Sequence, residues 1–77
     1  MKLSYTNVCA YLRSKGWRFL QLLDGVEIWT INFDDEQYHL SLPLNGSESQ
    51  YCGDALSILA YTEDREIESI KKDIICL

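Results

Sequence analysis

The clearest pattern in the chain is the alternation of apolar and polar residues over residues 17–44. Over residues 38–44 large apolar residues occupy every second position, which is the period of a β-strand with one buried face. Residues 29–33 alternate in the same way, with Trp29, Ile31 and Phe33 on one face. Acidic turns separate three such runs. The pattern therefore predicts a three-stranded antiparallel meander.

The register of the first hairpin decides which apolar side chains face the core. Asp24-Gly25 tolerates the positive φ values of a two-residue type I′ turn, and a three-residue loop with a bulge is the alternative. The two-residue register leaves the following residues outside the core: Trp17, Phe19, Leu23, Val26 and Ile28. The bulged register leaves outside a different set: Leu20, Leu22, Val26 and Ile28. Either register predicts a second apolar face, which more often marks an interface than a monomer surface.

Helical periodicity flanks the predicted sheet on both sides. Before it, Ser4 or Thr6 can cap a first helix that ends at Gly16, a residue suited to the left-handed position after a helix. After it, Ser47 and Gln50 have the spacing of a capping box, which predicts the start of a second helical region.

The C-terminal region is predicted to be one helix or two. Residues 54–77 contain neither Gly nor Pro, and their apolar residues recur at helical spacing. A single helix over residues 47–77 would be about 45 Å long, so we favour two helices hinged at Thr62-Glu63-Asp64. The predicted fold is thus α+β, a single domain over residues 1–77 with the order α-β-β-β-α-α.

Composition and charge limit the classes of partner. A chain of 77 residues, 47% of them hydrophobic, can form a core, but a domain of this size buries only about 60% of its unfolded surface, so self-association would help it. Twelve acidic and seven basic residues give a net charge of −5, which disfavours nucleic acid because phosphates require positive charge. Neither a membrane-spanning run nor a signal-peptide core is recognisable, so we expect a cytoplasmic protein without membrane contact.

The residues that could carry chemistry do not form a recognised motif. Cys9, Cys52 and Cys76 are widely spaced, without a CxxC or zinc-ligand pattern, and we expect them to be reduced and structural. His39 is the only histidine, and no neighbour in sequence suits it for acid-base chemistry or metal binding. The acidic run Asp34-Asp35-Glu36 lacks the spacing of an EF-hand loop. We therefore expect no enzymatic activity, no metal and no cofactor.

Several short pieces of the chain resemble a group of small bacterial proteins of unknown function. These pieces are Tyr11-Leu12-Arg13, Gly16-Trp17, Trp29, Pro43-Leu44, Tyr51 and Leu59-Ala60. The order α-β-β-β-α is also similar to double-stranded-RNA-binding domains and to the HicA family of small toxic ribonucleases, over roughly residues 4–62. The HicA resemblance implies a catalytic histidine in a Gly-Ser-His setting after the first turn, but here Gly25 is followed by Val26-Glu27. The resemblance therefore assigns no catalytic residue to this sequence. The chain also lacks the basic residues that such domains use to bind RNA.

The sequence thus predicts a non-enzymatic, acidic interaction module that forms a homodimer or binds another protein through the second apolar face of its sheet. The candidate interface residues are Trp17, Phe19, Leu23, Val26, Ile28 and His39. The alternative is a degenerate HicA-like or double-stranded-RNA-binding-like domain that acts on RNA.

Overall fold

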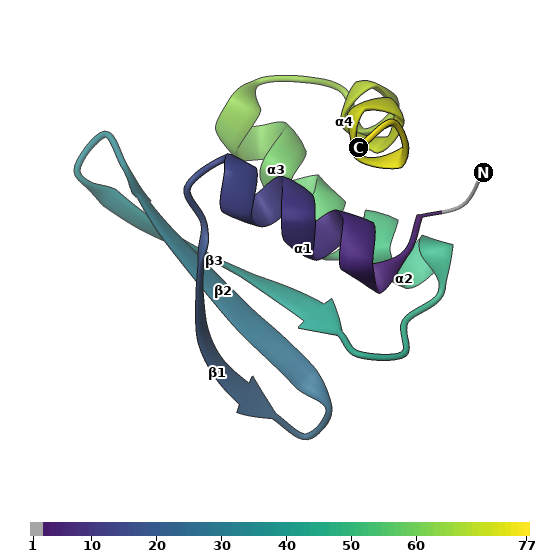
Figure 1. The fold of residues 1–77 in the computed structure, drawn as a ribbon. Helices are drawn as coiled ribbons and strands as arrows, with labels where there is room; N and C mark the ends of the chain where they lie inside the picture. Colours follow the sequence, from purple (N-terminus) through teal and green to yellow (C-terminus); the bar gives the residue numbers. More distant parts are fainter. Residues whose placement is uncertain (1–2) are drawn as a thin grey trace.

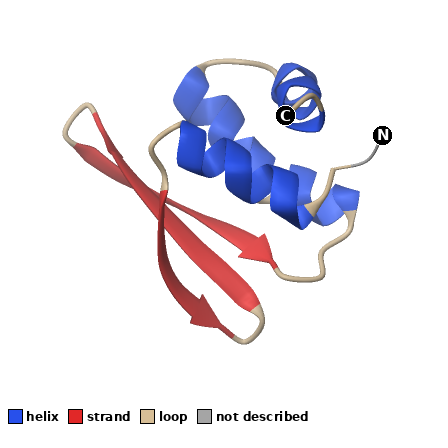
Figure 2. Cartoon of the chain, viewed as in Figure 1, coloured by secondary structure: helices blue, strands red, loops and turns tan. Residues whose placement is uncertain are grey.

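A computed structural model describes residues 3–77 as a helix, a three-stranded sheet and three further helical segments (Figure 1). The elements are α1 (Tyr5–Ser14), β1 (Arg18–Leu23), β2 (Val26–Phe33), β3 (Glu36–Pro43), α2 (Glu48–Gly53), α3 (Ala55–Glu63) and α4 (Ile67–Ile75). This arrangement confirms the α+β class and the predicted element order. The helices gather on one side of the sheet, as the colouring by secondary structure shows (Figure 2).

Helix α1 begins and ends at the residues that its sequence indicates. The Ser4 hydroxyl accepts a hydrogen bond from the Asn7 backbone N–H at 3.2 Å, which satisfies one of the free donors of the first turn. Gly16 adopts a φ of 93°, in the left-handed region that favours glycine. The Trp17 N–H then donates to the Leu12 carbonyl at 2.9 Å, so the first strand begins directly after the helix.

The sheet is an antiparallel meander in the order β1-β2-β3, with two-residue turns at both ends. The first turn, Asp24-Gly25, has φ values of 50° and 77°, as a type I′ turn requires. A β-bulge interrupts the pairing of β1 with β2 between Phe19 and Gln21, so that Leu20 is the extra residue. The sequence presented a tight turn and a bulge as alternatives, whereas the structure contains both.

The C-terminal region turns at two places. The predicted capping box is present at the start of α2, where the Ser47 hydroxyl accepts from the Gln50 N–H and the Gln50 side chain accepts from the Ser47 N–H at 2.7 Å. The predicted hinge is confirmed at Asp64, which ends α3 with a φ of 53°. A second change of direction at Asp54 separates α2 from α3.

The core lies between the sheet and the helices. Trp29, Leu40 and Leu42 enter it from β2 and β3, and all three are almost fully buried. The helical contribution comes from α1, α3 and α4 through Val8, Leu12, Leu56, Leu59, Ile70 and Ile74. Because these helices cover β3 and part of β2, the buried part of the sheet is its β3 side, whereas β1 is exposed along its whole length.

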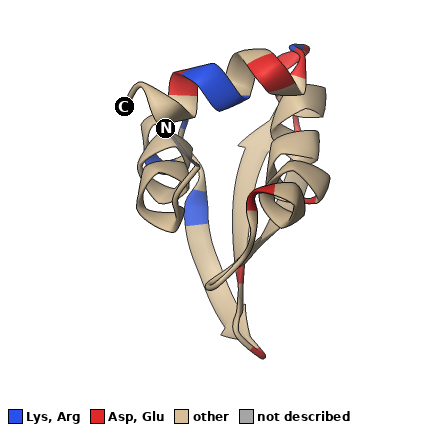
Figure 3. Ribbon diagram, turned by 90° about the vertical axis from the view of Figure 1, so that its right-hand side faces the viewer, with Lys and Arg blue, Asp and Glu red and all other residues tan. Residues whose placement is uncertain are grey.

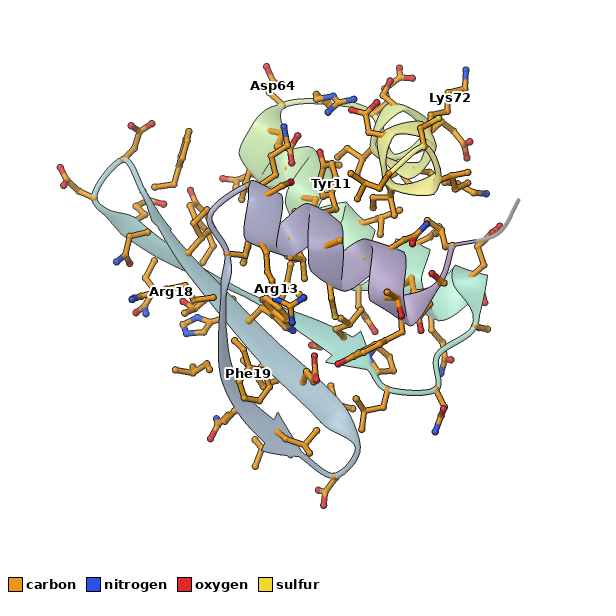
Figure 4. All side chains as sticks on the ribbon, viewed as in Figure 1. Tyr11, Arg13, Arg18, Phe19, Asp64 and Lys72 are labelled. Atoms are coloured by element: carbon orange, nitrogen blue, oxygen red, sulfur yellow. The ribbon has the colours of Figure 1, made fainter. Side chains whose placement is uncertain are left out.

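A polar cluster joins α1 to the corner between α3 and α4 (Figure 4). The Tyr11 hydroxyl donates to the two carboxylate oxygens of Glu63 at 2.9 and 3.0 Å. Arg65 pairs with Glu63 at 3.1 Å and with Asp73 at 2.7 Å. Burial and the bond to the Glu63 carboxylate raise the pKa of Tyr11 to about 12. The cluster therefore fixes the position of α4 over the core.

Candidate protein-interaction surface

Strand β1 lies at the edge of the sheet, outside the area that the helices cover (Figure 1). All six of its residues are exposed, although four of them are large and apolar. The exposed fractions are 52% for Phe19, 50% for Leu20, 53% for Leu22 and 52% for Leu23. Val26 and Ile28, on the part of β2 that pairs with this strand, are half-buried. We call these six residues, Phe19, Leu20, Leu22, Leu23, Val26 and Ile28, the apolar arm.

The apolar arm is hydrophobic on both faces of the sheet because of the bulge. Leu22 pairs with Glu27, and Phe19 pairs with Trp29, so both β1 residues lie on the helix side although they are three positions apart. A regular strand would place residues three apart on opposite faces, and the extra residue of a bulge removes this alternation. Leu23 pairs with Val26 on the outer face. Each face of the arm therefore exposes apolar surface.

The base of the arm is held against α1 by aromatic and charged groups. The Trp29 ring is 2% exposed, and the edge of Phe19 packs on it with 6.1 Å between ring centroids. The guanidinium carbon of Arg13 lies 5.5 Å from the centroid of the same ring, within the range of a cation–π interaction. Figure 4 shows Arg13 descending from α1 toward the sheet, close to Phe19. These contacts position the start of β1.

The Glu27 carboxylate connects the same region to the start of α1. It accepts hydrogen bonds from the Trp29 indole N–H at 2.9 Å and from the Tyr5 hydroxyl. The bond to this carboxylate, together with burial, raises the pKa of Tyr5 because both favour its neutral form. Glu27 is thus a charged group on the helix side of the sheet whose oxygens are used by two neighbouring side chains.

The outer face of the sheet changes from apolar to polar along its length. Its rows across the strands are Leu23-Val26-Pro43, then Gln21-Ile28-Ser41, then Arg18-Thr30-His39. In the third row, the Thr30 hydroxyl donates to the Tyr38 carbonyl at 3.0 Å and accepts from the Gln37 side chain at 3.2 Å. The exposed apolar surface is therefore concentrated at the β1–β2 turn and does not extend over the whole face.

The structure places the predicted interface residues in three environments. Phe19, Leu23, Val26 and Ile28 come together on the apolar arm. His39 is exposed on the outer face, in the polar third row. Trp17 is 4% exposed and belongs to the core, so its assignment to the interface is corrected. The bulge at Leu20 turns Trp17 and Phe19 to the helix side, where Trp17 is buried.

Leu20 and Leu22 also belong to the surface, although they are absent from the predicted interface. The bulged register left both outside the core, and the two-residue register placed both inside. The observed Leu22 faces the helix side, as the two-residue register requires, but it is 53% exposed there. Its exposure therefore depends on the extent of the helical layer, which the alternation within β1 does not encode.

Charged residues are sparse on the strands and frequent on α4 and at turns (Figure 3). Strand β1 contains a single charged residue, Arg18 at its start, and Asp24 follows directly after its end. By contrast α4 carries both signs, including Lys71, which pairs with Glu48 of α2 at 2.8 Å. Strand β1 is thus uncharged between the positive Arg18 at its start and the negative Asp24 after its end, and Glu27 of β2 is the charged group beside Leu22 on the helix side.

The other candidate residues do not assemble into a reactive centre. His39 and Ser41 line a shallow hollow of about 220 Å³ beside Asp54. Among residues 3–77, no three His, Cys, Asp or Glu side chains are grouped so that they could hold a metal ion. All three cysteines are free, and burial raises the pKa of the Cys9 thiol, which disfavours its reactive thiolate.

A larger hollow of about 430 Å³ opens at the β2–β3 turn, away from the apolar arm. Phe33 and Tyr61 line it and are 49% and 72% exposed. Its charged lining groups are the carboxylates of Asp34, Glu36 and Asp64. Aromatic rings and carboxylates therefore line this hollow together, whereas the arm presents apolar side chains.

In the part of the chain that the structure describes, none of the helices is both long enough and apolar enough to cross a membrane. Comparisons with protein-family models, with curated proteins and with solved structures found no match to this chain.

Proposed function

We propose that the protein is a non-enzymatic interaction module that associates with a second copy of itself through the apolar arm. The observation that carries this proposal is the half exposure of four large apolar side chains on one edge strand. Contiguous apolar surface is unfavourable in water by about 25 cal/mol per Å², and on soluble proteins it commonly marks an interface.

A second copy of the chain suits this surface better than an unrelated partner. A two-fold contact brings the same patch of both copies together, so an apolar patch is automatically complementary to itself. The arm contains no strongly charged group between Arg18 and Asp24 that would select a partner of opposite charge. The small size of the chain also favours association, because a domain of 77 residues has little apolar surface buried within itself.

Sedimentation velocity between about 1 and several hundred micromolar tests this proposal. The wild-type protein should form dimers with rising concentration, and Leu23→Glu should stay monomeric because it places a charge in the buried contact. The matched control is Leu77→Glu, because Leu77 is 59% exposed and lies outside the arm. A wild-type protein that remains monomeric throughout this range would contradict the proposal, as would equal effects of the two substitutions.

The cytoplasm is the location that we propose for this module. All three cysteines are free, including Cys76, which is exposed. Disulfides form and persist in oxidising compartments and are rare in the reducing cytosol, so exposed free thiols support this location.

A second candidate function is RNA binding by a degenerate HicA-like or double-stranded-RNA-binding-like domain. The supporting observation is the element order, with helices on one side of a three-stranded antiparallel sheet. The net charge of −5 opposes it, because binding to phosphates relies on Lys and Arg. A retardation assay with double-stranded and single-stranded RNA at low salt distinguishes the candidates, and absence of a shift would end this one.

A further inference from the structure

We infer that the two copies join edge to edge, with β1 of one copy antiparallel to β1 of the other. Their sheets then form one continuous sheet, with three strands from each copy. This inference rests on the proposed self-association and specifies its geometry. The alternative geometry is a stack in which the outer faces of two sheets pack against each other.

The free edge of β1 is the first reason for this geometry. Strand β1 pairs with β2 on one side, and within residues 3–77 no strand pairs with its other side. Such an edge presents unpaired N–H and C=O groups, which natural proteins usually protect with Lys, Pro or a covering element. Strand β1 contains neither Lys nor Pro, whereas β3 ends at Pro43 and packs against α2 and α3. The two edges of the sheet are therefore not equivalent.

The distribution of apolar side chains is the second reason. A face-to-face stack would bury Leu23, Val26 and Ile28 but would leave Phe19 and Leu22 exposed on the helix side. Edge pairing about a two-fold axis perpendicular to the sheet keeps each face on its own side. The helix-side residues of both copies then meet on one face, and the Leu23 side chains lie on the other. Edge pairing is thus the arrangement that uses both apolar faces of the arm.

Charge sets the direction of the two strands. Arg18 begins β1, and Asp24 follows its last residue. A parallel arrangement would place like charges near each other at both ends. An antiparallel arrangement places Arg18 of each copy near Asp24 of the other, so two attractive pairs form. The N-terminal end of one strand therefore meets the C-terminal end of its neighbour.

A pair of charge-reversal variants tests the direction. Arg18→Glu and Asp24→Lys should each weaken self-association at least tenfold, because each homodimer would contain two like-charged contacts. An equimolar mixture should recover association, because both contacts in the mixed dimer have opposite charges. Circular dichroism of each variant checks that the fold is intact, since Asp24 has a φ of 50°.

Net charge alone predicts a different result for these variants. Arg18→Glu changes the net charge from −5 to −7, and Asp24→Lys changes it from −5 to −3. General repulsion between acidic copies would therefore weaken association of the first variant and strengthen that of the second. Local pairing between the strand ends is supported if self-association is weaker in both variants and recovers on mixing. These effects should disappear at high salt.

Isotope-filtered NMR of a dimer with one labelled and one unlabelled copy distinguishes edge pairing from stacking. Paired strands lie about 4.8 Å apart, whereas stacked sheets lie about 10 Å apart. Edge pairing should give cross-copy contacts between backbone protons of β1, and stacking should give contacts between outer-face side chains alone.

The outcomes separate the inference from the proposed function. A dimer that Leu23→Glu disrupts, but that lacks backbone contacts between β1 strands or recovery on mixing, overturns the edge geometry and leaves self-association standing. If the wild-type protein is monomeric at several hundred micromolar, both the edge geometry and the proposed self-association are contradicted. Backbone contacts together with recovery on mixing support the antiparallel edge pairing.

Discussion

Leu22 and Leu42 lie in the same row of the sheet, on either side of Glu27, and have opposite environments. Both pair with Glu27, so both point to the helix side. Leu42 on β3 is fully buried beneath the helices, whereas Leu22 on β1 is 53% exposed. Alternation within a strand therefore determines only which face a residue occupies. Burial on that face depends on which part of it the helices reach.

Truncation of these two leucines should give the largest difference in stability. Leu42→Ala should lower the free energy of unfolding by about 2–5 kcal/mol, because it removes buried methyl groups and leaves a cavity. Leu22→Ala should change it by less than about 0.5 kcal/mol in the monomer, as expected for a surface position. Urea denaturation at low micromolar concentration measures both effects. Similar losses for the two variants would show that the arm is covered within one copy.

Local features of the fold could be predicted from the sequence because each depends on a few neighbouring residues. The Ser4 cap, the capping box at Ser47, the turn at Asp24-Gly25 and the hinge at Asp64 belong to this group. Each involves side chains or φ values within about four residues, so the residue type alone carries the signal.

The bulge at Leu20 could not be placed in the same way. A bulge within a strand of Phe and Leu residues changes the facing of its neighbours without requiring Gly or Pro, so the composition of β1 does not mark it. The position of Trp17 follows from this bulge, and its burial also requires the core beneath it. Both predicted registers put Val26 and Ile28 on the side away from the core, where the strand pairing has them, whereas they disagreed on the side of Leu22.

Glu27 lies between the exposed Leu22 and the buried Leu42. Its truncation should therefore lower the free energy of unfolding by an amount between the effects of truncating these two leucines. Glu27→Ala removes the acceptor used by the buried Trp29 indole and by Tyr5, so we expect a loss of about 1–3 kcal/mol in unfolding free energy. Tyr5→Phe should cost less, about 0.5–1.5 kcal/mol, because the carboxylate keeps the indole bond. Glu27→Gln is the conservative control, since it retains one oxygen acceptor.

A double-mutant cycle with Glu27→Ala and Tyr5→Phe measures how strongly the two groups depend on each other. The two changes should be non-additive by about 0.5 kcal/mol or more, because the second change cannot remove a bond that is already lost. Additive effects would indicate that the hydroxyl and the carboxylate are not coupled in solution. The start of α1 would then not be tied to the boundary of the arm.

Tyr11 lies in the part of the molecule that the helices bury, and its hydroxyl donates to the Glu63 carboxylate near the α3–α4 corner. Tyr11→Phe should lower the free energy of unfolding by about 0.5–1.5 kcal/mol at pH 8, less than Leu42→Ala or Glu27→Ala. Glu63 keeps its pairing with Arg65 in this variant, which limits the loss.

The effect of Tyr11→Phe should depend on pH in a direction that the raised pKa fixes. The folded-state pKa of Tyr11 is about 12, above its ordinary value of 10.0, so the wild-type phenol contributes its full stability below pH 10. This contribution is lost as the pH rises toward 12, because the unfolded chain releases the proton first. The advantage of the wild-type protein over the variant should therefore narrow as the pH rises from 10 toward 12, until the contribution of about 0.5–1.5 kcal/mol is lost. Tyr5 and Cys9 also have raised pKa values, but both are present in the two proteins and cancel in the difference. Denaturant unfolding of both proteins from pH 8 to 11.5 checks this, and a constant difference would show that Tyr11 is not buried against Glu63.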